Sequence, residues 1–221
     1  EQKFEKSRFT RVDSDVIDRL IAKEEHKEAN LESNQREILS SVFRSQLPQI
    51  KKVEFNVETQ ALGENGAPIM ITQSEYMRRM KEMANIQAGM SFYGEMPNMY
   101  NLVLNADHKL VKQVLTDADN SCKAALEPIE SEMANLNNRR KELQKAQEGK
   151  KTEDIPQAEK DELNDIEKKI SDETTKKQAV LGEYANGNKI IHQLIDLALL
   201  QNNMLKGEAL TNFVKRSIEL I

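Results

Sequence analysis

The residue types that carry most enzyme chemistry are few in this chain and far apart in the sequence. The three histidines are His26, His108 and His192, and none has a Cys or a second His beside it, as a metal site would require. Cys122 has only Lys123 as a basic neighbour, whereas a reactive thiolate needs a more electropositive setting. We therefore interpret these residues as surface, half-buried or small helix positions, and expect no catalytic and no metal-binding residues.

Phosphate and nucleic-acid binding are disfavoured in the same way. Gly63 and Gly66 lie in a run of turn residues and lack the Lys-Ser/Thr that follows a phosphate-binding loop. The net charge is −5, and the short basic runs at 139–141 and 150–151 are diluted by acidic neighbours. No run of 18 apolar residues occurs, and a lone cysteine is typical of a reducing compartment. We expect no cofactor, no nucleic acid and no membrane span.

Methionine is the residue type whose spacing suggests a binding surface. Six of the nine methionines fall between 77 and 99. Tyr76, Met77, Met80 and Met83 share one face of a helix predicted for 75 to about 87, with Ser74 as its N-cap. Met adapts to varied partners and is frequent at binding surfaces, but such a stripe is also common in cores, and the residues alone favour neither reading.

The elements around this helix predict an α+β fold that is mostly helical. Of the 221 residues, 38% are hydrophobic, 31% charged and 5% aromatic, which is typical of helices with long solvated faces. A strand at 51–59 and its hairpin partner at 69–72 should join a third strand at 100–104 in a small antiparallel sheet. Helices are predicted from 34 to 47 and, capped by Asp107, over 110–115.

The segment 117–186 has the pattern of an inserted helical hairpin. From 117 to 183 it carries 17 acidic and 12 basic residues, so it accounts for the whole net charge of −5. Two runs with apolar residues at helical spacing flank a polar turn at 149–156, which predicts an antiparallel coiled coil. Pro128 is expected in the first turn of one arm or at a kink. Residues 1–25 are interpreted as the tail of a preceding domain with its linker.

The last two predicted helices have more apolar surface than a small domain can cover. The stretch 189–205 is apolar on both sides of its helical wheel, and a final helix after Gly207 has one broad apolar face. Two such pairs about a two-fold axis would form a four-helix bundle, so a homodimer is expected. In the alternative, the hairpin or the domain core covers this surface.

Three stretches in this order resemble the C-terminal dimerisation domain of the ninety-kilodalton heat-shock chaperones, in particular the bacterial members. They are Ser74-Glu75-Tyr76-Met77-Arg78-Arg79-Met80-Lys81, Asn101-Leu102-Val103-Leu104-Asn105-Ala106-Asp107-His108 and Leu194-Ile195-Asp196-Leu197-Ala198-Leu199-Leu200. The resemblance covers about residues 34–116 and 188–221, so 26–116 and 187–221 are taken as that domain. The hairpin at 117–186 exceeds the family pattern, and its role stays open.

The resemblance implies a cytoplasmic, ATP-driven homodimeric chaperone whose ATP and Mg²⁺ site lies outside this chain. This segment would then be no enzyme; it would hold two copies together and bind unfolded or partly folded client proteins. Residues expected to face clients are Tyr76, Met77, Met80, Met83, Phe92 and Tyr93. Residues expected in the dimer bundle are Leu194, Leu197, Ala198, Leu200, Leu210, Phe213 and Ile218.

A function of another class competes with this one. The chain could be a structural coiled-coil scaffold in which the 117–186 hairpin makes the contacts with partners. Deleting the hairpin separates the two, because the chaperone interpretation expects dimers to persist without it. An enzyme is a distant third, and its simplest sign would be a bound metal or phosphate in a pocket lined by His108 or His192.

Overall fold

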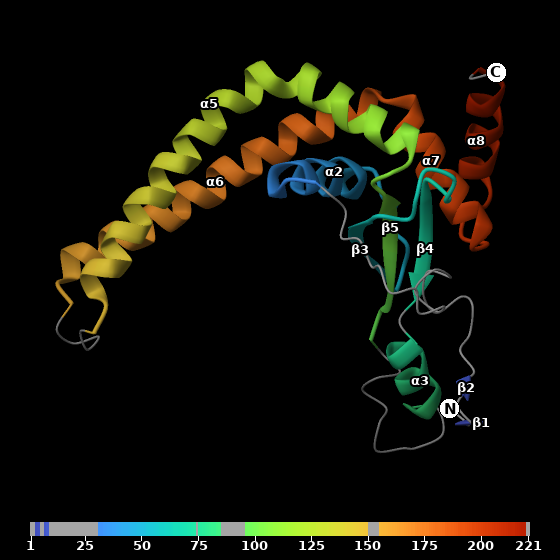
Figure 1. The fold of residues 1–221 in the computed structure, drawn as a ribbon, viewed down its shortest axis with the longest axis horizontal. Helices are drawn as coiled ribbons and strands as arrows, with labels where there is room; N and C mark the ends of the chain where they lie inside the picture. The colour runs from blue at the N-terminus through green and yellow to red at the C-terminus, as the bar shows by residue number, and fades with distance from the viewer. Residues whose placement is uncertain are drawn as a thin grey trace.

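A small sheet with helices packed on one face forms the centre of the molecule. The computed structural model describes residues 3–4, 7–8, 31–73, 75–84, 96–149 and 155–219. The elements are β1 (Lys3–Phe4), β2 (Ser7–Arg8), α2 (Ser33–Ser45), β3 (Val53–Gln60), β4 (Ile69–Gln73), α3 (Glu75–Ala84), β5 (Asn98–Asn105), α5 (Lys109–Gln147), α6 (Gln157–Gly187), α7 (Lys189–Gln201) and α8 (Glu208–Glu219). The expected fold class, α+β and mostly helical, is confirmed. In Figure 1 the α5–α6 hairpin projects to one side of the sheet, and α7 and α8 stand on the other.

The three strands were predicted, but the expected hairpin between the first two is wrong. The order is β3-β5-β4, with β5 parallel to β3 and antiparallel to β4, so the sheet is mixed and the expected antiparallel sheet is wrong. β5 is the central strand. Leu102, Val103 and Leu104 are all buried, and because successive side chains point to opposite faces, β5 is covered on both faces there. Eight residues separate β3 from β4, which is long for a tight hairpin and leaves room for β5 between them.

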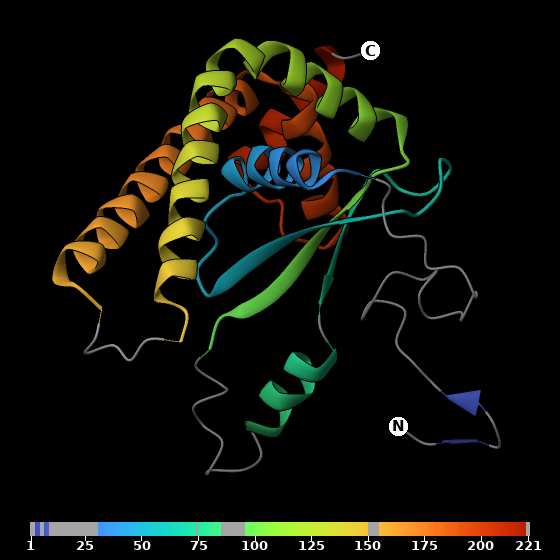
Figure 2. The same ribbon diagram turned by 60° about the vertical axis from the view of Figure 1, so that its left-hand side comes forward.

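One face of the sheet carries the apolar core. Leu102 of β5 lies between Val57 of β3 and Ile71 of β4, and all three belong to a cluster that includes buried residues of α2, α5, α6 and α7. Phe43 of α2 is fully buried in the same cluster. Figure 2 shows α2 lying directly over the strands, with the other core helices around it. The core therefore joins the C-terminal helices to the part of the α5–α6 hairpin that holds Cys122, Leu126, Leu181 and Ala185, which we call the hairpin base.

A buried asparagine ties the β3–β4 connection to the end of β5. Asn105 has no exposed surface; its Oδ1 accepts from the Leu62 and Asp107 amides at 3.1 Å each, and its Nδ2 donates to the Gly63 carbonyl at 2.9 Å. Gly66 passes so close that a Cβ there would lie 2.7 Å from the Leu62 carbonyl oxygen. This polar centre fixes the loop against the sheet.

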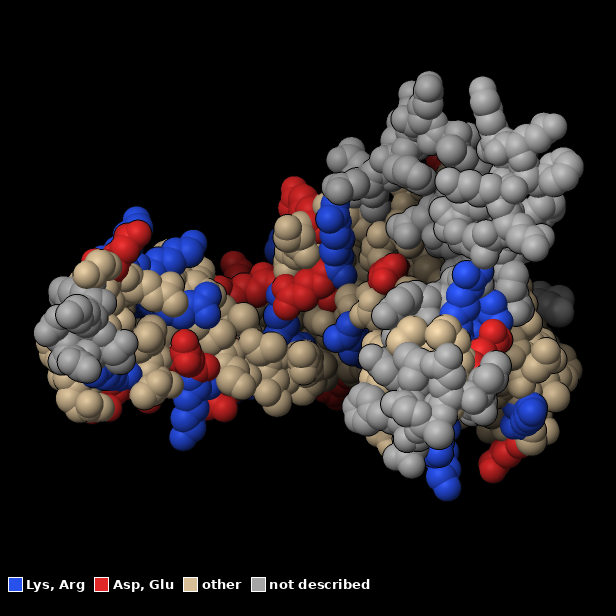
Figure 3. Space-filling model, turned by 90° about the horizontal axis from the view of Figure 1, so that it is seen from below, with Lys and Arg blue, Asp and Glu red and all other residues tan. Residues whose placement is uncertain are grey.

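The predicted helical hairpin is confirmed, but its first arm is longer than expected. The short helix predicted at 110–115 and the first arm are one 39-residue helix, α5, which contains Pro128 and bends in its middle part (Figures 1 and 2). His108, and not Asp107, is the N-cap: its Nδ1 accepts from the Leu110 amide, whereas the Asp107 carboxylate accepts from the Gly63 amide. Charged side chains of both signs lie along the outer hairpin (Figure 3).

Candidate interaction site

Helix α7 begins with a complete side-chain cap. Asn188 Oδ1 accepts from the Ile190 and Ile191 amides at 3.0 and 3.2 Å, and its Nδ2 donates to the Tyr184 hydroxyl at 2.9 Å. This explains why the chain can end α6 and start α7 with a single residue between them. The cap sets the direction in which α7 leaves the hairpin base.

One side of α7 closes on the core of its own chain. Ile191, Leu194, Ile195, Ala198 and Leu199 are all buried there, and α7 packs against β4. After the helix, Asn203 and Gly207 adopt positive φ angles of 56° and 61°, which turn the chain back on itself. The following helix, α8, returns alongside α7.

Polar contacts fix α8 antiparallel to α7. Lys189 at the start of α7 pairs with Glu219 at the end of α8 at 2.7 Å. Gln193 Nε2 donates to Ser217 Oγ at 2.6 Å, one helical turn further along. The paired helices stand at the edge of the molecule (Figure 1), and α8 has no buried residue.

A partly buried ion pair completes the α7–α8 contact. Arg216 of α8 donates to the Asp196 carboxylate of α7, and each side chain is 19% exposed. Burial raises the pKa of Asp196, and the charge and hydrogen bond of Arg216 oppose that rise. The pair therefore aligns the helices, while burial of the carboxylate still disfavours its charged form.

Four large apolar side chains of this helix pair are exposed. Leu197 and Leu200 of α7 are 36% and 37% exposed, and Val214 and Ile218 of α8 are 49% and 69% exposed. They are four of the six large apolar residues that are exposed in the described ranges. Val214 was not among the residues expected in the bundle, although its spacing of four from Ile218 places both on one helix face.

The remaining residues expected in the bundle pack within their own chain. Leu194 and Ala198 are 4% and 0% exposed and belong to the core cluster. Leu210 and Phe213 are half-buried and pack against that cluster. Of the expected set, Leu197, Leu200 and Ile218 are therefore the exposed residues, and Val214 is exposed with them.

Helix α3 lies at the far end of the sheet from α7 and α8 (Figure 1). None of the side chains described in it, residues 78–84, is buried. Met80 is half-buried and Met83 is 43% exposed, and Lys81 Nζ donates to Asn98 Oδ1 at 2.7 Å, which holds α3 to the start of β5. Met99 on that strand is 41% exposed.

Part of the predicted client-facing set and of its helix lies outside the described residues. These are the side chains of Tyr76 and Met77, and Phe92, Tyr93 and the expected N-cap Ser74. Met80 and Met83 are the predicted client-facing residues whose side chains can be placed.

The residues considered for chemistry occupy separate places. Cys122 is 3% exposed in the core; burial raises the pKa of its thiol, and the nearby Asp119 raises it further. His108 caps α5, and His192 lies with Nε2 3.1 Å from the Asn186 carbonyl oxygen. Across the described ranges no group of three His, Cys, Asp or Glu side chains converges as metal ligands would. Within the same part of the chain, every helix is too short or too polar to cross a bilayer.

Comparison with known proteins identifies related sequences over the whole chain. It is 68% identical over 221 residues to the chaperone protein HtpG of Bacteroides fragilis and 66% identical to that of Bacteroides thetaiotaomicron. It is 45% identical over 223 residues to the chaperone protein HtpG of Porphyromonas gingivalis. The chain spans 32% of the length of each of these relatives. No protein-family model and no solved structure matches it.

Proposed function

We propose that this chain, a segment of an HtpG-type chaperone, joins two copies of the protein through α7 and α8 and presents α3 to unfolded client proteins. The relatives that it matches are named as chaperones, and this confirms the resemblance to the ninety-kilodalton heat-shock family. In the proposal, the segment is the C-terminal domain of a cytoplasmic protein, and the ATPase site lies in the rest of the polypeptide.

The observation that carries the dimer proposal is the exposure of four large apolar side chains on the α7–α8 pair. Each helix already uses one side within its own chain, yet four large aliphatic side chains remain exposed on the outside. Exposed aliphatic residues concentrated on one helix pair are typical of interaction sites. Two antiparallel pairs meeting about a two-fold axis would form a four-helix bundle and cover these residues.

The internal contacts of the pair support a preformed surface. The Lys189–Glu219 and Asp196–Arg216 pairs and the Gln193–Ser217 hydrogen bond hold α8 in register with α7 within one chain. A second copy would then meet two helices whose relative position is already set, which lowers the entropy lost on association.

Exposure of α3 supports the client-binding half of the proposal. The described part of α3 has no buried side chain, and Met83 and Met99 both expose more than a third of their surface. Flexible, polarisable Met side chains fit many apolar partners, which suits a protein that binds varied unfolded chains.

Dimerisation is tested by measuring the mass of the chain in solution at micromolar concentration. Light scattering should give twice the mass of one chain, and the double variant Leu197→Glu with Ile218→Glu should give the monomer. The matched control is Asn212→Glu, an exposed polar position on α8, which should stay dimeric. A parent protein that is monomeric at these concentrations contradicts the proposal.

Client binding is tested with Met80→Ala combined with Met83→Ala. The variant should suppress aggregation of a heat-denatured reporter protein several-fold less well than the parent, with an unchanged melting temperature, because neither side chain is buried. Met133→Ala, a half-buried methionine on the hairpin, should keep full activity. A clear drop in melting temperature for the double variant would show that α3 is packed as core.

The scaffold function is the second candidate, and the projecting hairpin favours it (Figure 1). Its test must spare the core, because Cys122, Leu126, Leu181 and Ala185 of the hairpin base belong to the apolar cluster. Replacing residues 131–173 with a short glycine-rich turn removes only the outer arm. Dimers that survive this deletion support the α7–α8 proposal, whereas loss of assembly supports the scaffold.

A further inference from the structure

The hairpin base contains a buried lysine that links three helices. Lys177 of α6 is 4% exposed, and its Nζ lies 3.0 Å from Asn34 Oδ1 and 3.0 Å from Glu37 Oε2, both on α2. The same Nζ lies 3.1 Å from Glu130 Oε1 on α5. A buried ammonium group is stable only when it is paired and hydrogen-bonded. Here Lys177 donates two hydrogen bonds, to Asn34 and Glu37, and Glu130 adds a second carboxylate at ion-pair distance. We call these four residues the hairpin clamp.

The clamp stands where the hairpin leaves the core. On the inner side, Leu126 of α5 and Leu181 of α6 belong to the central apolar cluster. On the outer side, Leu143 and Ile166 are the buried apolar residues of the described arms, and neither belongs to that cluster. The buried apolar residues of the outer arm are therefore separate from the central cluster, and at the clamp both arms of the hairpin are linked to α2 by polar contacts.

A weak point in α5 lies beside the clamp. Pro128 has no amide hydrogen, so the carbonyl of Ala124 loses its helical partner, and the proline ring crowds the preceding turn. Prolines inside helices are the usual cause of kinks, and α5 bends in its middle part (Figures 1 and 2). Glu130 follows Pro128 by two residues, so the clamp grips α5 immediately beyond this joint.

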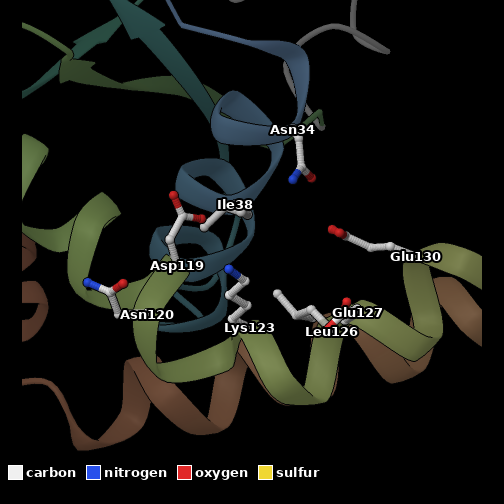
Figure 4. Close-up of a pocket in the computed structure, with 8 residues that line it drawn as sticks. All are labelled: Asn34, Ile38, Asp119, Asn120, Lys123, Leu126, Glu127 and Glu130. Atoms are coloured by element: carbon white, nitrogen blue, oxygen red, sulfur yellow. The ribbon is translucent and has the colours of Figure 1, made fainter.

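Open space borders the same turn of α5. A groove of about 420 Å³ lies between α2 and α5, lined by Asn34 and Ile38 on one side and by Lys123, Leu126 and Glu130 on the other. Figure 4 shows Asn34 and Glu130 at one end of this groove and Asp119 and Asn120 at the other. α5 is thus not packed tightly against α2 along the turn that holds Pro128, and two clamp residues face the groove.

We propose that Pro128 and Lys177 form a lockable hinge that sets the direction of the outer hairpin. Pro128 supplies the joint in α5, and the clamp holds the arm in one direction by linking α5 and α6 to α2. When the clamp is broken, the outer arm, residues 131–173, changes direction relative to the sheet. The hairpin is then a movable arm with one locked position.

The hinge is tested by pulsed EPR distances on the full chain. Nitroxide labels are placed at Gln144→Cys on the outer arm and Glu54→Cys on the sheet, two exposed positions, in a Cys122→Ala background. The labelled parent should give one narrow distance distribution. Lys177→Met should at least double its width or add a second population. Lys176→Met removes a neighbouring lysine whose side chain is 62% exposed, and should leave the distribution unchanged.

A double variant tests the role of Pro128 separately from that of Lys177. Lys177→Met combined with Pro128→Ala should restore the narrow distribution, because an uninterrupted helix resists bending without the clamp. A Lys177→Met distribution as narrow as the parent, or a double variant as broad as Lys177→Met, overturns the proposal.

Folding of the variants is checked by circular dichroism. Lys177→Met should fold, because Glu37 and Glu130 are 49% and 38% exposed and can be hydrated without the lysine. If it does not, Glu37→Gln with Glu130→Gln removes both ion pairs while the lysine stays, and the same broadening is expected. A narrow distribution in that variant also overturns the hinge.

Discussion

Ile218 gives the most direct measure of the proposed pairing surface, because it exposes 69% of its area, the largest share among the large apolar residues of the described chain. Fully burying an Ile side chain stabilises by about 1.5–3 kcal/mol. The exposed share of Ile218 is therefore worth about 1–2 kcal/mol for each copy that becomes covered. Two-fold symmetry places the residue in the interface twice, so Ile218→Ala should weaken dimerisation by about 2–4 kcal/mol.

That free energy corresponds to a large change in affinity. Since about 1.4 kcal/mol is a factor of ten, the dissociation constant of Ile218→Ala should rise roughly 30- to 1,000-fold over the parent. Sedimentation velocity over a dilution series from micromolar to nanomolar chain measures this directly. The melting temperature of the monomer should not fall, because Ile218 makes little contact within its own chain and Ala is the better helix former.

The control for this measurement is Asn212→Ala on the same helix. Asn212 is also exposed, so its replacement brings the same gain in helix propensity without removing an apolar side chain. Its dissociation constant should stay within about threefold of the parent. If Ile218→Ala and Asn212→Ala have equal dissociation constants, Ile218 is not covered by a second copy and the pairing surface has been placed wrongly.

Two further predictions concern folding of the single chain. Asn105→Ala leaves two amides and a carbonyl without their buried partner and should lower the free energy of unfolding by about 2–5 kcal/mol; a loss under about 1 kcal/mol in urea titrations contradicts this. The second prediction concerns Asp196, whose pKa in the folded chain is raised by burial despite Arg216. The folded chain therefore holds this proton more tightly than the unfolded chain does. The resulting stabilisation is full below the ordinary pKa of about 4 and is lost as pH rises through the raised value. Asn cannot ionise, so Asp196→Asn should not show this loss of stability. The unfolding free energy of the variant minus that of the parent should increase from about pH 4 to neutrality. A difference that stays constant with pH contradicts the raised pKa of Asp196.

Local sequence signals were sufficient to place most helices and strands of the described chain. The alternation over 51–59 predicts β3, and the apolar spacing over 34–47 predicts α2, within one to two residues at most ends. Asn188 caps α7 at the position where the sequence turns polar. The helix or strand type of these elements follows from the spacing of apolar residues near each other in sequence, which is why pattern and propensity suffice to place them.

Strand pairing could not be read in the same way. Which neighbour a strand takes depends on the burial of both its faces. β5 has three consecutive buried apolar residues and takes the central place, so the pairing expected between β3 and β4 does not form. The signal available in the sequence was the uninterrupted apolar run Leu102-Val103-Leu104, because a strand with one solvated face should alternate apolar and polar residues.

The hairpin clamp was also not predicted, although the spacing of apolar residues in α6 indicates an unusual position for Lys177. Ile166, Ile170, Lys177 and Leu181 follow steps of four, seven and four, so Lys177 occupies a position of the apolar stripe of α6. A lysine in such a stripe must either reach solvent or find buried acceptors, and only the position of α2 decides between the two. Asn34 and Glu37 lie more than 130 residues away in sequence, beyond the reach of local patterns.

The proposed pairing and the proposed hinge have a common consequence, because one apolar cluster connects the hairpin base to α7. Helices α7 and α8 and the outer hairpin lie on opposite sides of the sheet in Figure 1. A two-fold axis through α7 and α8 would therefore carry the two hairpins outward on the far sides of the dimer. In the proposed dimer, the α7–α8 contact would set where the outer arm of the other copy begins. Lys177 would set whether each outer arm keeps its direction. A dimer with an intact clamp would hold both arms at one separation, and a dimer without it would vary that separation without any change in its interface.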